Sequence, residues 1–398
     1  MVILCSSVLM SSSKRYLVAC SAGPDSMALL DIYRRKCEVK VCHINYHHRD
    51  TADRDENIIR KYCDKHGLEL FVYDYKESKG NFQEAARNFR YDCFSKLVDE
   101  YKLDGVLVAH HKDDLIETYL MQRERGSVSF YGLKEENTVR GGRVIRPLLN
   151  TSKAELIEYD REHDIEYGID ESNLGNDYKR NRIRHSTVEK MSAEKKNEII
   201  GEINRLNNEL RIKEEAVNSF INGKDRFAAD EFLGCRYVKD VLRKLLYVDL
   251  SEAYLDEILK ALLRNGVEIK VHSKFISRVY DSIEVYPERQ DYAYVLSEVE
   301  YKDFGEFVLM ESGDDFHGVT LSADDFHITI RNYHEGDFIK MRYGTKKLNR
   351  YFIDHKISYR ERRSYPVMVN RNNEVVLVPG IGSNVNHYSK HHSVYMLK

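Results

Sequence analysis

The sequence predicts an α/β protein whose N-terminal domain is a doubly wound parallel sheet, followed by a helical middle domain and a mixed α+β C-terminal domain. The chain has 398 residues, more than one hydrophobic core usually serves. Strand-like runs alternate with amphipathic segments up to about residue 150, and two-residue periodicity returns beyond about residue 265. We expect domains over residues 1–215, 216–290 and 291–398.

Short apolar runs rich in Val, Ile and Leu predict the buried strands of the N-terminal sheet, at Tyr16–Cys20, Val39–Ile44, Leu68–Asp74 and Val106–Ala109. Capping-box starts at Asn81-x-x-Glu84 and Ser152-x-x-Glu155 predict helices over Phe82–Tyr101 and Lys153–His163. Because strands alternate with helices, the sheet should be parallel and should bind ligands at the carboxyl ends of its strands.

The later part of the chain begins with a helical pattern. Ser192–Ile221 predicts a connecting helix, Gly223–Arg226 a boundary, and Val238–Leu263 two short amphipathic helices. Strand-like runs follow at Glu268–Val271, Phe275–Val279, Phe307–Met310, Val319–Leu321, His327–Arg331 and Val375–Val378. The C-terminal third is therefore expected to contain much β-structure.

Composition narrows the class of protein. With 42% hydrophobic and 32% charged residues the chain is globular, and no apolar run reaches the ~18 residues that span a bilayer. Met1–Leu9 has neither a basic leader nor a small-residue cleavage site, so we expect a soluble cytoplasmic protein with no membrane partner. The seven cysteines form no C-x-x-C pair, which disfavours a disulfide framework, a zinc ribbon or an iron–sulfur cage. The paired histidines lack partners at ligand spacing, so no protein-only metal site is predicted.

Charge is segregated along the chain, although the formal net charge is only −3. Lys340–Arg363 contains nine basic and two acidic residues, and Lys179–Lys190 contains five basic residues and one acidic residue. Solvated helix faces would explain both segments, but Lys and Arg gathered in an acidic chain also suit a phosphate backbone. The longer segment is interleaved with Tyr343, Tyr351, Phe352 and Tyr359, and from it we select the expected contacts to a phosphate backbone, namely Arg342, Lys346, Lys347, Arg350, Arg360, Arg362 and Arg363.

A small-residue turn, Ser21–Ser26, separates the first strand from the helical run Met27–Leu30. A strand, a tight turn and a helix N-terminus together aim backbone N–H groups and the positive end of the helix dipole at an anion, so phosphate is the expected ligand. The turn matches neither G-x-x-x-x-G-K-[ST] nor G-x-G-x-x-G, which argues against simple γ-phosphoryl transfer and dinucleotide binding. An ordinary strand–helix turn is the plain alternative.

The turn resembles the SGGxDS signature of the N-type ATP pyrophosphatases, with Ala22 where that signature has its first glycine. Further motifs occur in order, and together they resemble the tRNA(Ile)-lysidine synthetase family over nearly the whole chain. They are His43-Ile44-Asn45, Glu84–Arg87 with Arg90-Tyr91, Ala109–Asp114 with Glu117-Thr118, Ile145–Leu149, Asp170–Asn173 with Arg180-Asn181, Glu335–Phe338, Lys346–Leu348, Tyr351–Asp354 and Pro366-Val367. Tyr46 departs from the family, which more often has a second His there.

This resemblance implies an enzyme that uses ATP with Mg²⁺ to join L-lysine to carbon-2 of the wobble cytidine of the isoleucine tRNA with a CAU anticodon, through an adenylated cytidine. It implies an ATP site at Ser21, Ala22, Gly23, Pro24, Asp25, Ser26 and His43. It implies lysine binding by Asp114, Glu117 and Arg180, and adds Asp25 and His110 to these three as catalytic residues. Either a carboxylate or His110 would deprotonate the amine. A homodimer is compatible with these features.

Two other functions remain open. A tRNA thiolase with the same loop would need relay or cluster cysteines, and Cys20 before the loop has no companion. A non-catalytic tRNA-binding protein would keep the fold without a working phosphate loop, and Ala22 motivates that alternative. Release of AMP in the presence of tRNA separates enzyme from binder, and a requirement for lysine separates ligation from thiolation.

Overall fold

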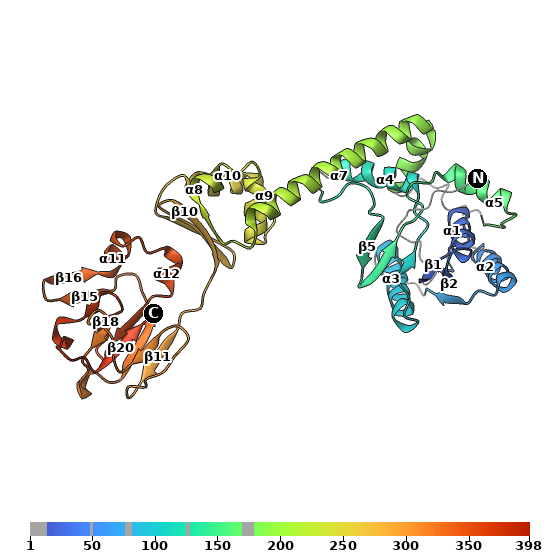
Figure 1. Ribbon diagram of the computed structural model, residues 1–398. Coiled ribbons are helices and arrows are strands. Elements are labelled where there is room, and N and C mark those ends of the chain that lie inside the picture. Colours follow the sequence, from blue (N-terminus) through green and yellow to red (C-terminus); the bar gives the residue numbers. More distant parts are fainter. Residues whose placement is uncertain (1–13, 48–50, 76–81, 125–127, 169–178) are drawn as a thin grey trace. The chain divides into compact units, whose positions relative to one another are not determined.

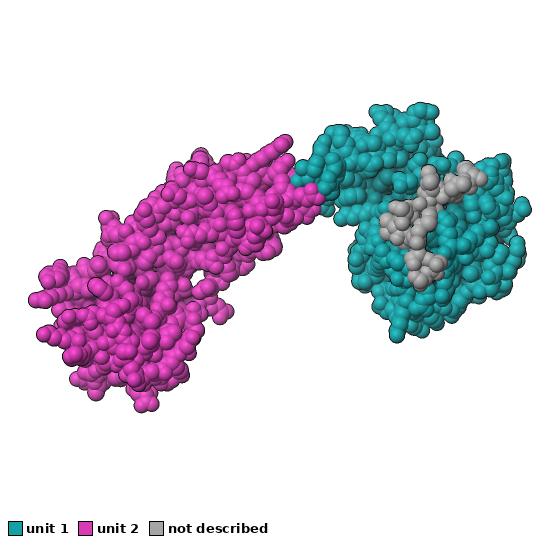
Figure 2. Space-filling view, viewed as in Figure 1, with its two compact units in different colours: residues 1–212 teal, residues 213–398 magenta. Residues whose placement is uncertain are grey.

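The computed structural model describes residues 14–47, 51–75, 82–124, 128–168 and 179–398. The chain divides into two compact units, Met1–Ile212 and Lys213–Lys398, which are coloured separately in Figure 2. The boundary falls inside helix α7 (Ala193–Ile221), which fits the connecting helix predicted there. Two of the predicted motifs, Asn81 of the first capping box and Asp170–Asn173, lie outside the described residues.

The first unit is built on a six-stranded sheet with the order β3-β2-β1-β4-β6-β5. Its strands are β1 (Arg15–Ala19), β2 (Glu38–Asn45), β3 (Leu70–Asp74), β4 (Val106–Leu107), β5 (Glu136–Val139) and β6 (Gly142–Ile145). All neighbouring strands are parallel except β5 and β6, which form an antiparallel hairpin at the edge. The four predicted strands and the parallel arrangement are confirmed, whereas the hairpin was not predicted.

Helices cover both faces of this sheet (Figure 1). One face packs in a single core with α1 (Pro24–Arg34), α2 (Ala52–His66) and α5 (Lys153–Glu162), and the other face packs against α3 (Phe82–Glu100). The strand order reverses direction between β1 and β4, so the loops after these two strands diverge. A doubly wound sheet binds its ligands in the crevice at such a point.

A second core extends the unit beside that crevice. It joins α4 (Lys112–Arg123) to α6 (Lys179–Ser186), to a short 3-10 turn (Val188–Lys190) and to the start of α7, through side chains such as Ile116, Val188 and Ile203. The α4 helix begins at His111 with a capping box: His111 Nδ1 accepts from the Asp113 amide, and Asp114 Oδ2 accepts from the His111 amide. The second core therefore places the acidic start of α4 next to the basic helix α6.

The second unit opens with an antiparallel sheet in the order β7-β10-β9-β8. Its elements are β7 (Arg226–Ala228), α8 (Ala229–Leu233), α9 (Val238–Leu246), α10 (Glu252–Leu262), β8 (Val267–Val271), β9 (Lys274–Val279) and β10 (Ser282–Pro287). Phe232 and Leu242 of the helices share one core with Ile276 and Ile283 of the sheet. The helices of the middle region thus pack on a sheet rather than forming a purely helical body.

The rest of this unit contains a five-stranded sheet (β11-β14-β17-β18-β19), a three-stranded sheet (β12-β20-β13) and the hairpin β15–β16. The elements are β11 (Ala293–Leu296), β12 (Val308–Met310), β13 (Gly318–Val319), β14 (Ile328–Asn332), β15 (Phe338–Met341), β16 (Gly344–Lys347), α11 (Leu348–Asp354), α12 (Tyr359–Arg363), β17 (Pro366–Val369), β18 (Val375–Val378), β19 (Gly382–Ser383) and β20 (Val394–Leu397). The expected mixture of α and β is confirmed. Within the described ranges, no helix has the length and apolar character needed to cross a bilayer.

Candidate active site

The loop after β1 is a braced turn. Ser26 Oγ accepts from the Ser21 amide at 3.1 Å and donates to the Gly23 carbonyl at 2.9 Å, which ties both ends of the loop together. Gly23 is the N-cap of α1 and Pro24 is its first residue, a position where a missing N–H costs nothing. The helix N-terminus therefore follows directly after the turn, as anion binding requires.

Ala22 is the residue of this loop whose backbone has a positive φ angle. This residue has φ +66° and its side chain is fully buried, so alanine here adopts the left-handed conformation that glycine tolerates best. Gly23 has φ −69°, and a Cβ built there would meet nothing closer than Ser21 Oγ at 3.7 Å. The fold itself therefore does not require glycine at position 23.

His43 holds the neighbouring strand end in place. Its Nδ1–H donates to the Cys20 carbonyl at 2.9 Å, which joins the carboxyl ends of β2 and β1. Burial lowers the pKa of His43, although the hydrogen bond to Cys20 opposes that shift. Burial therefore favours the neutral form of this side chain beside the loop.

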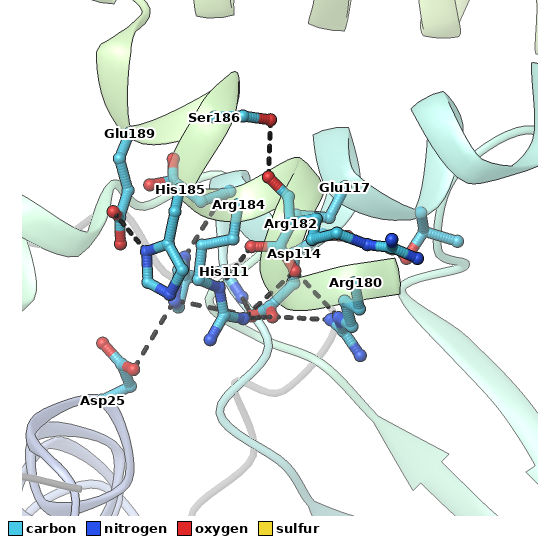
Figure 3. Close-up of polar contacts among 12 residues, drawn as sticks. Asp25, His111, Asp114, Glu117, Arg180, Arg182, Arg184, His185, Ser186 and Glu189 are labelled. Atoms are coloured by element: carbon cyan, nitrogen blue, oxygen red, sulfur yellow. Dashed lines mark hydrogen bonds and ion pairs between the residues drawn. The ribbon is translucent and has the colours of Figure 1, made fainter. Parts of the chain in front are cut away.

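His111 connects the loop to the acidic helix. Its Nε2 lies 3.5 Å from Asp25 Oδ2 on α1 and 3.5 Å from Asp114 Oδ2 on α4 (Figure 3). Because Nδ1 accepts the Asp113 amide, the ring proton sits on Nε2 and faces both carboxylates. The sequence interpretation named His110 and left His111 out. The feature that could have identified His111 is its place at the N-cap of α4, from which its side chain points back over the first turn of that helix.

Two arginines from α6 neutralise Asp114 and Glu117, the acidic pair of α4. Arg180 donates from Nε to Glu117 Oε2 and from NH2 to Asp114 Oδ1, both at 2.8 Å. Arg184 forms a two-point contact with Glu117, from Nε to Oε1 at 2.5 Å and from NH2 to Oε2 at 3.0 Å. The Arg184 side chain is 20% exposed and that of Arg180 is 41% exposed, whereas Glu117 has no exposed surface. Arg184 was not predicted, although its spacing of four residues from Arg180 places both on one helix face.

Burial alone would raise the pKa of Asp114. His111, His110 and Arg180 outweigh burial and lower that pKa to about 2. Asp114 is therefore an anion throughout the physiological pH range. An anion that is already buried and paired suits the binding of an ammonium group better than the acceptance of a proton.

His110 has a different partner from His111. The buried Arg146 donates from Nε to His110 Nδ1 at 3.0 Å and from NH1 to the Lys134 carbonyl at 2.9 Å. Burial lowers the pKa of His110 to about 4 although Asp114 opposes this, and Arg146 lowers it further. Since Nδ1 already accepts a hydrogen bond, the neutral ring carries its proton on Nε2. His110 therefore offers a donor, not a free base, to the crevice.

Asp113, in the first turn of α4, forms an ion pair with Lys196. Its two carboxylate oxygens each lie 2.8 Å from Nζ of Lys196, which comes from the first turns of α7. The pair is largely buried, with side-chain exposures of 17% for Lys196 and 9% for Asp113. This contact fixes the connecting helix to the helix that carries the acidic pair.

The basic residues expected to contact RNA separate into two groups. Arg342, Lys346, Lys347 and Arg350 are exposed. Arg362 is 7% exposed and donates to the Ile357 carbonyl at 2.9 Å, so its guanidinium is used inside the fold and its selection as an RNA contact needs correction. Arg360 pairs with Asp225 at 2.5 Å and Arg363 with Glu268 at 2.5 Å, which joins α12 to the middle region of the same unit. The density of basic residues in the sequence did not distinguish arginines that form contacts within the fold from those that are exposed.

Comparison with known proteins identifies the family of this chain. The family described as the PP-loop domain matches residues 4–191. The tRNA(Ile)-lysidine synthase of Mesoplasma florum is 30% identical over 92% of this chain and 98% of its own length, and that of Mycoplasma mycoides subsp. mycoides SC is 30% identical over 92% and 97%. Among solved structures, the U34-tRNA thiolase NcsA from Methanococcus maripaludis aligns with a TM-score of 0.43 at 16% identity, covering 51% of this chain and 74% of that one. With a phosphate loop, an acidic helix and full-length relatives of this kind, the chain belongs to the tRNA(Ile)-lysidine synthase family.

Proposed function

We propose that this enzyme joins L-lysine to carbon-2 of the wobble cytidine in the isoleucine tRNA with a CAU anticodon, with ATP as the activating co-substrate. The observation that carries the proposal is the meeting of Asp25 and Asp114 at His111. Asp25 belongs to the phosphate loop, whereas Asp114 belongs to the acidic pair. A site suited to a departing pyrophosphate and a site suited to an ammonium group therefore share one crevice.

In the first step, the carbon-2 oxygen of the cytidine attacks the α-phosphorus of ATP, and the bond to the β-phosphate breaks. The N-terminus of α1 would stabilise the charge that develops on pyrophosphate, because its dipole and loop amides are already in place. Asp25 Oδ1 is buried without a hydrogen-bond partner, and a carboxylate oxygen in this state fits a magnesium ion that arrives with the nucleotide. Bound magnesium would supply charge neutralisation.

In the second step, the lysine ε-amine attacks carbon-2 and AMP leaves with the activated oxygen. Asp114 and Glu117 are assigned to the incoming ammonium. Arg180, the more exposed of their two partners, must give way, and its planar fork then suits the lysine carboxylate. Arg184 remains on Glu117. Since His110 presents a donor and the pKa of Asp114 is about 2, we assign both side chains to holding the substrate and neither to removing the ammonium proton.

For the tRNA we assign a remote contact to the exposed basic residues of the C-terminal region. Reversing Lys346, Lys347 and Arg350 to Glu should weaken tRNA binding and lower the slope of log affinity against log salt by about 2 to 3, since each phosphate contact contributes about 0.7 to 0.9 to that slope. ATP affinity should stay the same. An unchanged tRNA affinity would contradict the assignment.

The direct experiment incubates the full chain with ATP, magnesium, radiolabelled lysine and unmodified transcript, and follows label into the RNA. Gly23→Ala should fold normally, because the new methyl has room, yet should cut tRNA-dependent pyrophosphate release at least about tenfold by filling the phosphate space. Gly201→Ala is the matched control, since Gly201 lies exposed on α7 with nothing within 4 Å of a Cβ. Full activity of Gly23→Ala would refute the assigned phosphate site.

The same assay separates the alternatives. A non-catalytic binder releases no AMP, and a thiolase releases AMP without lysine. The thiolase has little support from Cys20, because burial raises the pKa of its thiol to about 11 and so leaves it a poor nucleophile at neutral pH.

A further inference from the structure

The tip of the hairpin β15–β16 carries an uncovered aromatic ring. Arg342 and Tyr343 form its two-residue turn, between the paired residues Met341 and Gly344. The Tyr343 side chain is 92% exposed, the highest value among the large apolar side chains that the structure describes. Tyrosine in a folded chain usually covers its ring against other apolar atoms. A ring left open at the end of a ribbon is therefore available to a partner.

The basic residues around this ring indicate what kind of partner it binds. The Arg342 guanidinium lies 5.7 Å from the ring centroid, and no acidic residue occurs between positions 338 and 350. Lys340 pairs with Glu374 at 2.9 Å. By contrast, Arg342, Lys346 and Lys347 have no carboxylate within ion-pair distance in the described part of the chain. An open aromatic ring on a hairpin whose cations have no carboxylate partner is the combination that binds single-stranded or terminal nucleotides, where a base stacks on the ring and phosphates meet the cations.

We propose that the hairpin tip is an RNA-stacking element, in which Tyr343 stacks on an exposed nucleobase of the tRNA while Arg342, Lys346 and Lys347 contact the flanking phosphates. The proposal rests on the tRNA substrate of the proposed function and adds a mode of contact that depends on ring stacking rather than charge. Stacking of this kind changes affinity by about 5- to 100-fold per base and is insensitive to base identity. Cation contacts instead set the salt dependence.

The chain contains no tryptophan, so a single Tyr343→Trp substitution gives a unique fluorescent reporter. Stacking on a base should quench the indole of this variant when tRNA is added, and should reduce its accessibility to acrylamide at least about twofold. Phe316→Trp is the matched control: Phe316 is 65% exposed in the same unit and lies next to Asp314 and Asp315, whose charge repels RNA. Its fluorescence should not change.

Affinity measurements complete the test. Tyr343→Ala should weaken tRNA binding about 5- to 100-fold with the salt slope unchanged, and Tyr343→Phe should restore binding because the ring is kept. Both variants should melt like the wild type, since the ring is exposed. If the wild type binds tRNA and incorporates lysine while the Tyr343→Trp indole stays unquenched, or if Tyr343→Ala binds normally, the stacking proposal is overturned and the proposed function stands. A wild type that binds no tRNA overturns both.

Discussion

Asp160 is a buried acid without a partner. It lies on α5 with no exposed surface, and neither carboxyl oxygen has a hydrogen bond. Its neighbour Asp31, also buried, accepts from Tyr159 and from both Arg34 and Arg35. Burial, followed by the charges of Asp25 and Asp31, raises the pKa of Asp160 to about 8. At neutral pH this side chain is therefore a neutral acid in the folded protein.

The raised pKa makes the stability of the first unit depend on pH. Between the ordinary pKa of about 3.9 and the folded value of about 8, the folded state keeps a proton that the unfolded state has released, so stability falls as pH rises through this window. Each pH unit costs about 1.4 kcal/mol. The loss from pH 5 to pH 7 is then about 3 kcal/mol, and the full cost above pH 8 approaches about 6 kcal/mol.

Asp160→Asn removes the titration and keeps the shape of the side chain. We expect the variant to match the wild type within about 2 kcal/mol at pH 5 and to be more stable by about 3 to 6 kcal/mol at pH 8, or at least about 6 °C in melting temperature for a unit of this size. The assay is thermal unfolding at several pH values, with hydrogen exchange of α5 amides to assign the transition. Asp164→Asn, at an exposed position, should show no such trend. An advantage of Asp160→Asn that is equal at pH 5 and pH 8 would refute the reasoning.

Three further predictions concern the site. Ala22→Gly relieves the positive φ but loses a buried methyl worth about 0.8 kcal/mol, so stability in urea should change by less than about 0.5 kcal/mol, whereas Ala22→Val should lose about 2 kcal/mol or more. Arg184→Met leaves the buried Glu117 with one guanidinium; we expect about 3 kcal/mol less stability and a lysine KM raised at least about tenfold in steady-state assays, and an unchanged KM would contradict the role of Arg184. His110→Gln should slow the reaction without changing the shape of its pH profile, because the pKa of about 4 keeps the ring neutral above pH 5.5; an inflection that disappears in the variant would count against this.

Much of the fold could be predicted because local patterns determine it. The four buried strands and the helix over Lys153–Glu162 follow from apolar periodicity and a capping box. The hairpin β5–β6 was missed because Glu136–Val139 has little apolar character and its pairing depends on the turn at Arg140 and Gly141, both at positive φ. In the sheet beneath the middle helices, β8 and β9 were predicted from their apolar runs, whereas β7 and β10 were not.

The site divides in a similar way. Motifs that resemble those of the family selected Asp114, Glu117 and Arg180, which the fold brings together. These motifs did not distinguish His111 from its neighbour His110, because the two differ only in the direction of their side chains in the folded protein. One begins the helix and faces Asp25, whereas the other accepts from Arg146, a residue far along the chain. Partners supplied by tertiary structure are invisible to local pattern, and so are the ion pairs that occupy Arg360 and Arg363.

The arrangement of Asp25, His111 and Asp114 follows from strand order rather than from sequence distance. β1 and β4 are parallel neighbours, so the turns after them leave the same edge of the sheet, one into α1 and the other into α4. A carboxylate in the first turn of each helix then faces the other across the crevice, where two unscreened anions would repel. The imidazole N–H of His111 between them lessens that repulsion, and Arg180 neutralises the outer side of Asp114. The fold therefore brings one carboxylate from the loop after β1 and one from the start of α4 to a single imidazole N–H.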